Sequence, residues 1–112
     1  MRRNIMIRAV TYLLCAVLTA RAGRITNIDG RQETYYNLNM RRIVEKADNH
    51  FNLGNLYWVR EDGCKMYGKY VIVAADWKLH PYGTLVNTSR GMGIVLDTGE
   101  FSGEIIDIAT NW

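Results

Sequence analysis

Apolar residues recur at helical spacing in one part of the sequence. They fall at i, i+3, i+4, i+7 and i+11, which places them on one face of an α-helix. These positions are Met40, Ile43, Val44, Ala47 and Phe51. Asn39 precedes the pattern as a capping residue, and Gly54 follows it as a stop signal. The spacing predicts a helix over residues 39–51 that packs against the rest of the protein.

From residue 56 onward, the apolar positions form short runs that are typical of β-strands. Val, Ile, Tyr and Trp dominate these runs, and glycines separate them. The runs are LYWVRED, CKMY, KYVIVAADW, GTLVNT, GIVLD and EIIDIATNW. The sequence TYYNL at residues 34–38 also has the composition of a strand. Because strands this short cannot form two broad layers, the pattern predicts a mainly β domain in which a small closed barrel covers the strand edges.

The first 22 residues have the three-part layout of a secretory signal peptide. Arg2, Arg3 and Arg8 form a basic start, the apolar run AVTYLLCAVLTA follows, and ARA at residues 20–22 supplies small residues for cleavage. The apolar run is too short for a settled transmembrane helix; a buried N-terminal helix is the alternative. We expect a secreted or cell-envelope protein that has no stable membrane span once residues 1–22 are removed.

Removal of the signal changes the charge of the protein. The full sequence carries +3 at pH 7, and the signal contains four of its arginines and no acidic residue, so residues 23–112 carry −1. This charge offers no general attraction to nucleic acid, and no nucleic-acid partner is expected. Residues 23–33 are polar and turn-rich and are predicted to form a flexible lead-in. Residues 34–112 are then the single domain, which we expect to be a monomer.

Three aspartates end or interrupt the most apolar strands. Asp76 ends YVIVAAD, Asp97 ends GIVLD, and Asp107 lies within EIIDIA. Burial raises the pKa of a carboxyl group, and a second carboxylate nearby raises it further, which keeps an acid protonated near neutral pH. Breaking a glycosidic bond needs such a proton donor. A structural interpretation is also open: Asp97 in a plain Asp-Thr-Gly turn, Asp107 on an exposed edge strand, and Asp76 as a turn cap.

The remaining reactive side chains give weaker signals. Cys64 follows an Asp-Gly turn and is interpreted as an incidental thiol, whereas His80, in a loop, lines a site or is simply exposed. Trp77 and Tyr82 flank the same loop and are candidates for a cleft wall, because flat rings stack on sugars; core packing is the alternative. No spacing of ligand residues indicates a metal site, and no Gly-rich phosphate loop is present. We therefore expect neither a metal nor another cofactor.

The C-terminal half resembles the three-aspartate (3D) domain family. The resemblance rests on VAADWKLHPYGTLV, GIVLDTG and EIIDIA, which match Ala-x-Asp before an x-Pro-x-Gly-Thr turn, then Asp-Thr-Gly, then apolar-Asp-apolar. The aspartates that name the family correspond here to Asp76, Asp97 and Asp107. TYY at residues 34–36 is similar to the family's opening strand, and the match covers residues 70–112.

This family is similar to the catalytic domain of membrane-bound lytic transglycosylase A and is related to expansins and rare-lipoprotein-A-like proteins. The resemblance implies a small six-stranded double-psi β-barrel, here with one packing α-helix. It also implies cleavage of peptidoglycan glycan strands, in which an aspartic acid protonates the glycosidic oxygen and then acts as base toward the sugar's own 6-hydroxyl. Hydrolysis with water as nucleophile is left open.

The resemblance assigns roles to individual residues. Asp97 and Asp107 share a cleft as the catalytic carboxyl groups, and Asp76 supports its floor. The expected substrate-binding residues are Thr84 and Thr98 with hydroxyls for the carboxylates, Gly83 and Gly99 with tight turns beside the sugar, and Trp77, Tyr82, His80 and Tyr36 as lining.

Two other functions stay open. Glu100 stands where the family has a second glycine, and the stretch from Asp97 to Asp107 is about one residue shorter than usual. Both differences favour a non-catalytic wall-binding or wall-loosening module of the expansin type. A structural or partner-binding protein that uses an inherited barrel is the third possibility.

Overall fold

The computed structural model describes residues 24–26, 30–100 and 102–112, so the expected signal peptide lies outside the described residues. In this part of the chain the protein is mainly β, with eight strands and one helix. The strands are β1 (Arg24–Thr26), β2 (Gln32–Tyr36), β3 (Tyr57–Val59), β4 (Lys65–Tyr67), β5 (Tyr70–Ala74), β6 (Leu85–Thr88), β7 (Gly91–Asp97) and β8 (Ile105–Ala109). The helix is α2 (Arg41–Phe51). Within these residues, no helix has the length and apolar character needed to cross a bilayer.

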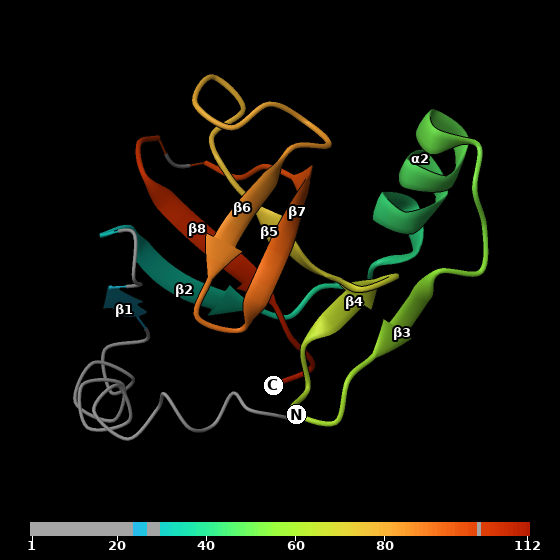
Figure 1. Cartoon of the computed structure of the whole chain (residues 1–112), viewed down its shortest axis with the longest axis horizontal. Coiled ribbons are helices and arrows are strands. Elements are labelled where there is room, and N and C mark those ends of the chain that lie inside the picture. Colours follow the sequence, from blue (N-terminus) through green and yellow to red (C-terminus); the bar gives the residue numbers. More distant parts are fainter. Residues whose placement is uncertain (1–23, 27–29, 101) are drawn as a thin grey trace.

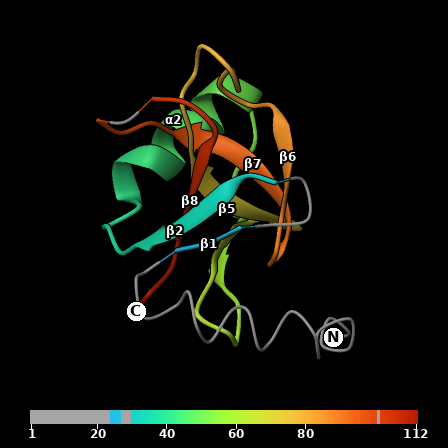
Figure 2. The same ribbon diagram turned by 90° about the vertical axis from the view of Figure 1, so that its left-hand side faces the viewer.

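Strand β5 is the centre of the sheet. It pairs in parallel with β7 and antiparallel with β4 and β8 (Figure 1). Beyond β8 lie β2, in parallel, and then β1; beyond β4 lies β3, and beyond β7 lies β6. Along one edge of β5, β4 pairs with its first residues and β8 with its last, and the sheet as a whole curls into a half-barrel. In Figure 2, α2 lies on one side of β2 and β8, and β6 lies on the other.

Both faces of the curled sheet carry a buried apolar cluster. Side chains alternate between the faces along a strand. On β5, Val71 and Val73 belong to a cluster on the face away from the helix, which also contains Ile106 and Ile108 of β8. Ile72 belongs to the second cluster, which we call the helix-side cluster: Met40, Ala47, Tyr67, Ile72, Ile94, Leu96 and Ala109. Since β5 is covered on both faces, its continuous apolar run reflects burial from two sides.

The predicted packing helix is confirmed. Met40 and Ala47 are buried in the helix-side cluster, and the other three apolar positions pack against it. The helix begins at Arg41, whose N–H donates to Asn39 Oδ1 at 2.9 Å, so Asn39 does satisfy a first-turn donor although it lies outside the helix.

The helix ends at Phe51, as predicted, and Gly54 lies beyond that end. Asn52 ends the helix in the left-handed conformation, with φ 57°, and its N–H bonds the carbonyl of Asp48. Asparagine adopts this conformation more readily than most residues with a side chain, and here it takes the part expected of glycine.

The six strands predicted from residue 56 onward are all present, but the expectation of a flexible lead-in at residues 23–33 needs correction. Residues 24–26 form β1, and they pair antiparallel with residues 32–34 of β2. Backbone hydrogen bonds to β2 therefore hold part of a segment whose polar composition gave no strand signal.

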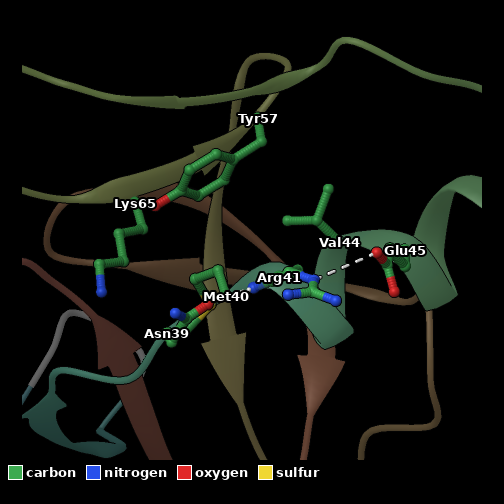
Figure 3. Close-up of a pocket in the computed structure, with 7 residues that line it drawn as sticks. All are labelled: Asn39, Met40, Arg41, Val44, Glu45, Tyr57 and Lys65. Atoms are coloured by element: carbon green, nitrogen blue, oxygen red, sulfur yellow. Dashed lines mark hydrogen bonds and ion pairs between the residues drawn. The ribbon is translucent and has the colours of Figure 1, made fainter.

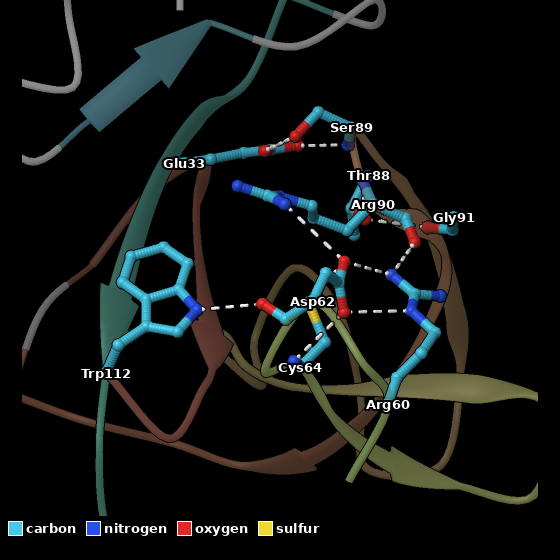
Figure 4. A network of polar contacts seen from close by, with 9 residues as sticks. All are labelled: Glu33, Arg60, Asp62, Cys64, Thr88, Ser89, Arg90, Gly91 and Trp112. Atoms are coloured by element: carbon cyan, nitrogen blue, oxygen red, sulfur yellow. Dashed lines mark hydrogen bonds and ion pairs between the residues drawn. The ribbon is translucent and has the colours of Figure 1, made fainter. Parts of the chain in front are cut away.

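The predicted closure of the barrel also takes a different form. Among the described residues no backbone ladder joins β2 to β6, and side chains connect these two regions instead. Glu33 of β2 is fully buried, and its carboxylate accepts hydrogen bonds from the backbone N–H and the hydroxyl of Ser89 in the β6–β7 turn (Figure 4). A buried carboxylate is costly unless such donors satisfy it, so this contact fixes the curl of the sheet.

Candidate active site

Four neighbouring strands place one residue each in a row across the sheet. Thr34 of β2 pairs with Asp107 of β8, Asp107 pairs with Ala74 of β5, and Ala74 pairs with Asp97 of β7. We call these four residues the aspartate row. Residues that pair across strands present their side chains on the same face. The two aspartates therefore flank Ala74 on one face, which is the face that α2 packs on.

A bulge in β7 decides the direction of Asp97. The pairing of β5 with β7 shifts after Val73, so that Ala74 pairs with Asp97 and Leu96 is an extra residue. In a regular strand Leu96 would lie beside Ala74, and Asp97 would point to the opposite face. The bulge thus brings Asp97 to the face of Asp107, in keeping with the frequent occurrence of bulges next to active sites.

Strand β2 supplies one hydroxyl to each aspartate. Thr34 Oγ1 donates to Asp107 Oδ1 at 2.7 Å, and the Tyr36 hydroxyl donates to Asp97 Oδ2 at 3.0 Å. Thr34 and Tyr36 are two residues apart, so both side chains lie on the face of the row. The predicted site residue Tyr36 is therefore next to both carboxyl groups. Thr34 was not among the predicted site residues.

The two aspartates influence each other electrostatically. Burial raises the pKa of Asp107, and the charge of Asp97 raises it further, whereas the hydrogen bond from Thr34 acts in the opposite direction. Burial also raises the pKa of Tyr36, and the nearby charges of Asp97 and Asp107 add to that effect. The Tyr36 phenol consequently stays a hydrogen-bond donor, and Asp107 holds its proton to a higher pH than an ordinary aspartic acid does.

Backbone groups and one indole fix Asp97. Its Oδ1 accepts from the N–H of Thr98 at 2.8 Å, and its carbonyl accepts from Trp77 Nε1 at 2.9 Å and from the N–H of Ala75 at 3.1 Å. Trp77 is therefore adjacent to the row. Thr98 contributes its backbone, whereas its hydroxyl was the expected donor.

The hydroxyl of Thr84, predicted to serve the carboxylates, does not reach them. It donates to the carbonyl of Pro81 at 2.6 Å, within its own turn. Gly83 also has a packing role: with φ +84°, it lies so close to α2 that an added Cβ would meet Phe51 Cζ at 3.1 Å. Gly99, the other predicted turn glycine, is exposed just beyond β7.

Asp76 lies outside the aspartate row and binds the segment of the chain between Asp97 and Asp107. Its Oδ2 accepts from the N–H of Gly103 at 3.0 Å and its Oδ1 from the N–H of Lys78 at 2.9 Å, and these bonds lower its pKa. His80 Nε2 lies 2.9 Å from Glu104 Oε1 in the same stretch. Asp76 therefore holds Gly103 in place, and His80 contacts Glu104, in the segment that leads into β8. This is a supporting position outside the aspartate row.

A pocket of about 480 Å³ lies elsewhere, at the start of α2 (Figure 3). Its lining residues are Asn39, Met40, Arg41, Val44, Glu45, Tyr57 and Lys65. Lys65 is buried there and donates from Nζ to Asn37 Oδ1 and to the Leu38 carbonyl, both at 2.7 Å. None of the predicted site residues lines this pocket, and the ammonium of Lys65 is used to hold the segment before the helix.

Among the described residues, no group of three or more His, Cys, Asp or Glu side chains has the arrangement of a metal site. Comparison of the sequence with protein-family models gives no match, and comparison with curated proteins gives none.

Proposed function

We propose that this protein is an exported enzyme that cleaves glycosidic bonds in the glycan strands of peptidoglycan, with Asp107 as the general acid. One observation carries the proposal. Two partly buried carboxyl groups share one face of the sheet, and the pKa of one of them is raised by burial and by the charge of the other. This is the arrangement that proton donation to a glycosidic oxygen requires.

The groups around Asp107 fit the proton transfer. Its Oδ1 accepts from Thr34, which leaves Oδ2 as the oxygen that carries the proton to be donated. Transfer of this proton to the glycosidic oxygen lets the C1–O bond break and the leaving sugar depart as an alcohol. The carboxylate left on Asp107 then takes the proton of the 6-hydroxyl, whose oxygen bonds to C1 and gives a 1,6-anhydro end. The negative charge of Asp97 stabilises the positive charge that develops at C1.

The proposed fold is the six-stranded double-psi β-barrel. Two parallel pairings support it, β2 with β8 and β5 with β7. Parallel strands need crossover connections, and the crossover from β5 to β7 passes through the antiparallel strand β6. A small sheet that combines parallel pairs with hairpins in this way is more consistent with an interlocked barrel than with a simple meander.

Mass spectrometry of peptidoglycan digested with the purified protein tests the proposal. We expect muropeptides with 1,6-anhydro ends from the parent protein and none from Asp107→Asn. Glu61→Gln removes an exposed carboxyl group in the β3–β4 turn and is expected to cleave like the parent. Products with reducing ends would mean that the enzyme is a hydrolase, in which water is the nucleophile, and not a transglycosylase. Absence of products from folded protein between about pH 4 and pH 8 would refute the enzyme.

A non-catalytic wall-binding module is the second candidate. Both carboxyl oxygens of Asp97 already accept hydrogen bonds within the protein, from Thr98 and from Tyr36, which suits a fixed polar surface as well as a reacting one. Sedimentation with insoluble peptidoglycan distinguishes the two candidates. Tight binding without soluble products supports the module, and it would make Asp107 a recognition group.

A further inference from the structure

The side chain of Lys46 extends from α2 to two aromatic rings beside the aspartate row. Its Nζ lies 4.8 Å from the centroid of the Trp77 ring and 4.8 Å from that of Tyr82. The two rings meet edge to face, with centroids 5.5 Å apart. An ammonium group is attracted to ring faces at such distances, so the two rings hold this cation at one position.

This position is one side chain away from a candidate catalytic residue. The indole N–H of Trp77 donates to the backbone carbonyl of Asp97 at 2.9 Å, so Trp77 contacts Lys46 through its ring and Asp97 through its N–H. Both rings belong to the loop that follows β5, directly after Ala74 of the row. The helix therefore contributes to the site as well as to the core.

The cation of Lys46 is exposed and takes part in none of the ion pairs between described residues. By contrast, Arg60 and Arg90 share the carboxylate of Asp62, and Arg31 pairs with Glu104. A positive charge that is fixed in position, lies beside the site and has no such acidic partner suits an anionic group of the substrate.

We infer that Lys46 binds a carboxylate carried by the muramyl residue of the substrate and so selects acidic glycans over neutral ones. This inference rests on the proposed function for its substrate class. In peptidoglycan every second sugar bears a lactyl group at O3, which ends in a free carboxylate where the stem peptide has been removed and carries the peptide carboxylates where it is present. Neutral chitin has the same backbone linkage and no carboxylate.

Binding measurements test the inference without depending on cleavage. Dissociation constants are measured for three ligands: glycan strands freed of stem peptides, glycan strands that retain them, and chitohexaose. We expect Lys46→Met to weaken binding of at least one acidic ligand about 5- to 10-fold and to leave chitohexaose unchanged, because methionine keeps the apolar stem against the rings. The acidic ligand that responds identifies the source of the carboxylate.

Lys69→Met is the matched control. Lys69 Nζ also lies over a ring, 5.5 Å from the centroid of Tyr70, but in the β4–β5 turn. We expect this variant to bind all three ligands like the parent. The inference is overturned if Lys46→Met binds the acidic strands as tightly as the parent, if it weakens chitohexaose equally, or if neither acidic ligand binds. A Lys46-dependent preference for acidic strands without any cleavage would refute the proposed enzyme and leave the inference standing.

Discussion

The hydroxyl of Tyr36 donates to Asp97 across 3.0 Å, although 61 residues separate them in the sequence. Burial raises the pKa of Tyr36 and the charge of Asp97 adds to this, so the phenol keeps its proton at acidic and neutral pH. The tyrosine thus fixes the direction of one carboxylate at every relevant pH. Its neighbour Thr34 does the same for Asp107 from the same strand.

Tyr36→Phe is expected to lower the rate of glycan cleavage about 10-fold, because Asp97 loses the donor that orients it. The free energy of unfolding should fall by about 1 kcal/mol, the usual contribution of one such hydrogen bond. Cleavage rates and thermal unfolding measure the two effects. Tyr70→Phe is the control, since Tyr70 packs against the same helix-side cluster and none of the hydrogen bonds between described residues joins its hydroxyl to Asp97 or Asp107. Equal losses in both variants would show that the effect comes from packing.

Thr34→Val is expected to shift the pH dependence of cleavage upward. The hydrogen bond from Thr34 lowers the pKa of Asp107, so its removal raises that pKa and the protonated acid persists to higher pH. Activity that depends on protonated Asp107 is lost as the pH rises through its pKa. The basic limb of the pH–rate profile, where the rate falls with rising pH, should therefore move to higher pH.

Asp97→Asn is expected to shift the pH dependence of cleavage downward, opposite to Thr34→Val. The charge of Asp97 raises the pKa of Asp107, so neutralising it should move the basic limb of any residual activity to lower pH. Rate measurements across the pH range for the parent and both variants test these shifts. If the two limbs moved in the same direction, Asp107 would not be the group that titrates.

The sequence predicts those parts of the fold that depend on local periodicity. The buried face of the helix could be predicted because Met40 and Ala47 recur at a spacing that a helix brings to one side. The predicted end at residue 51 is also confirmed, although the left-handed residue that follows it is Asn52 and not the more obvious Gly54. Strand β1 was not predicted, since its stability comes from pairing with β2 and not from its own composition.

The site was predictable in its residues but not in its geometry. Asp97 and Asp107 could be singled out because carboxylates at the ends of apolar strands are unusual. The face of Asp97, however, depends on a bulge at Leu96, and the continuous apolar run GIVL shows no break in alternation that would indicate it. The contact of Thr34 with Asp107 depends on parallel pairing between strands, and the two residues lie 73 positions apart in the sequence. The position of Lys46 over the Trp77 and Tyr82 rings depends on tertiary packing.

Asp76→Ala is expected to loosen the stretch that joins the two aspartates. The variant loses the acceptor for the N–H of Gly103, so hydrogen exchange at this amide should become about 10-fold faster, with little change in the strands. Cleavage should fall as well, because residues 98–104 connect Asp97 to Asp107. Lys78→Ala is the control, since it keeps the backbone N–H that Lys78 donates to Asp76. Unchanged exchange at Gly103 in Asp76→Ala would refute the supporting role.

Asp62 connects two hairpins through a network of charged groups (Figure 4). Asp62 lies in the β3–β4 turn. Its carboxylate accepts hydrogen bonds from Arg60 at 2.9 and 3.0 Å and from the N–H of Cys64 at 3.1 Å. It also accepts one from Arg90, in the β6–β7 turn, at 3.4 Å. Burial opposes ionisation of Asp62, but the hydrogen bonds from Arg60 and Cys64 and the charge of Arg60 outweigh it and lower its pKa. The network therefore stabilises the fold only while Asp62 is charged.

Asp62→Asn is expected to lower the free energy of unfolding by about 1 kcal/mol at pH 7, a value kept small by solvent around the pair. Because the folded pKa lies below the ordinary value of 3.8, the contribution is complete above that pH and is lost as the pH falls further. Denaturant unfolding of parent and variant at pH 7 and at successively lower pH should therefore show a difference that shrinks below about pH 4. Glu61→Gln, which changes the neighbouring exposed acid, should match the parent at both ends of the range. A difference between Asp62→Asn and the parent that stayed constant with pH would mean that the charge of Asp62 contributes nothing and that the side chain acts by shape alone.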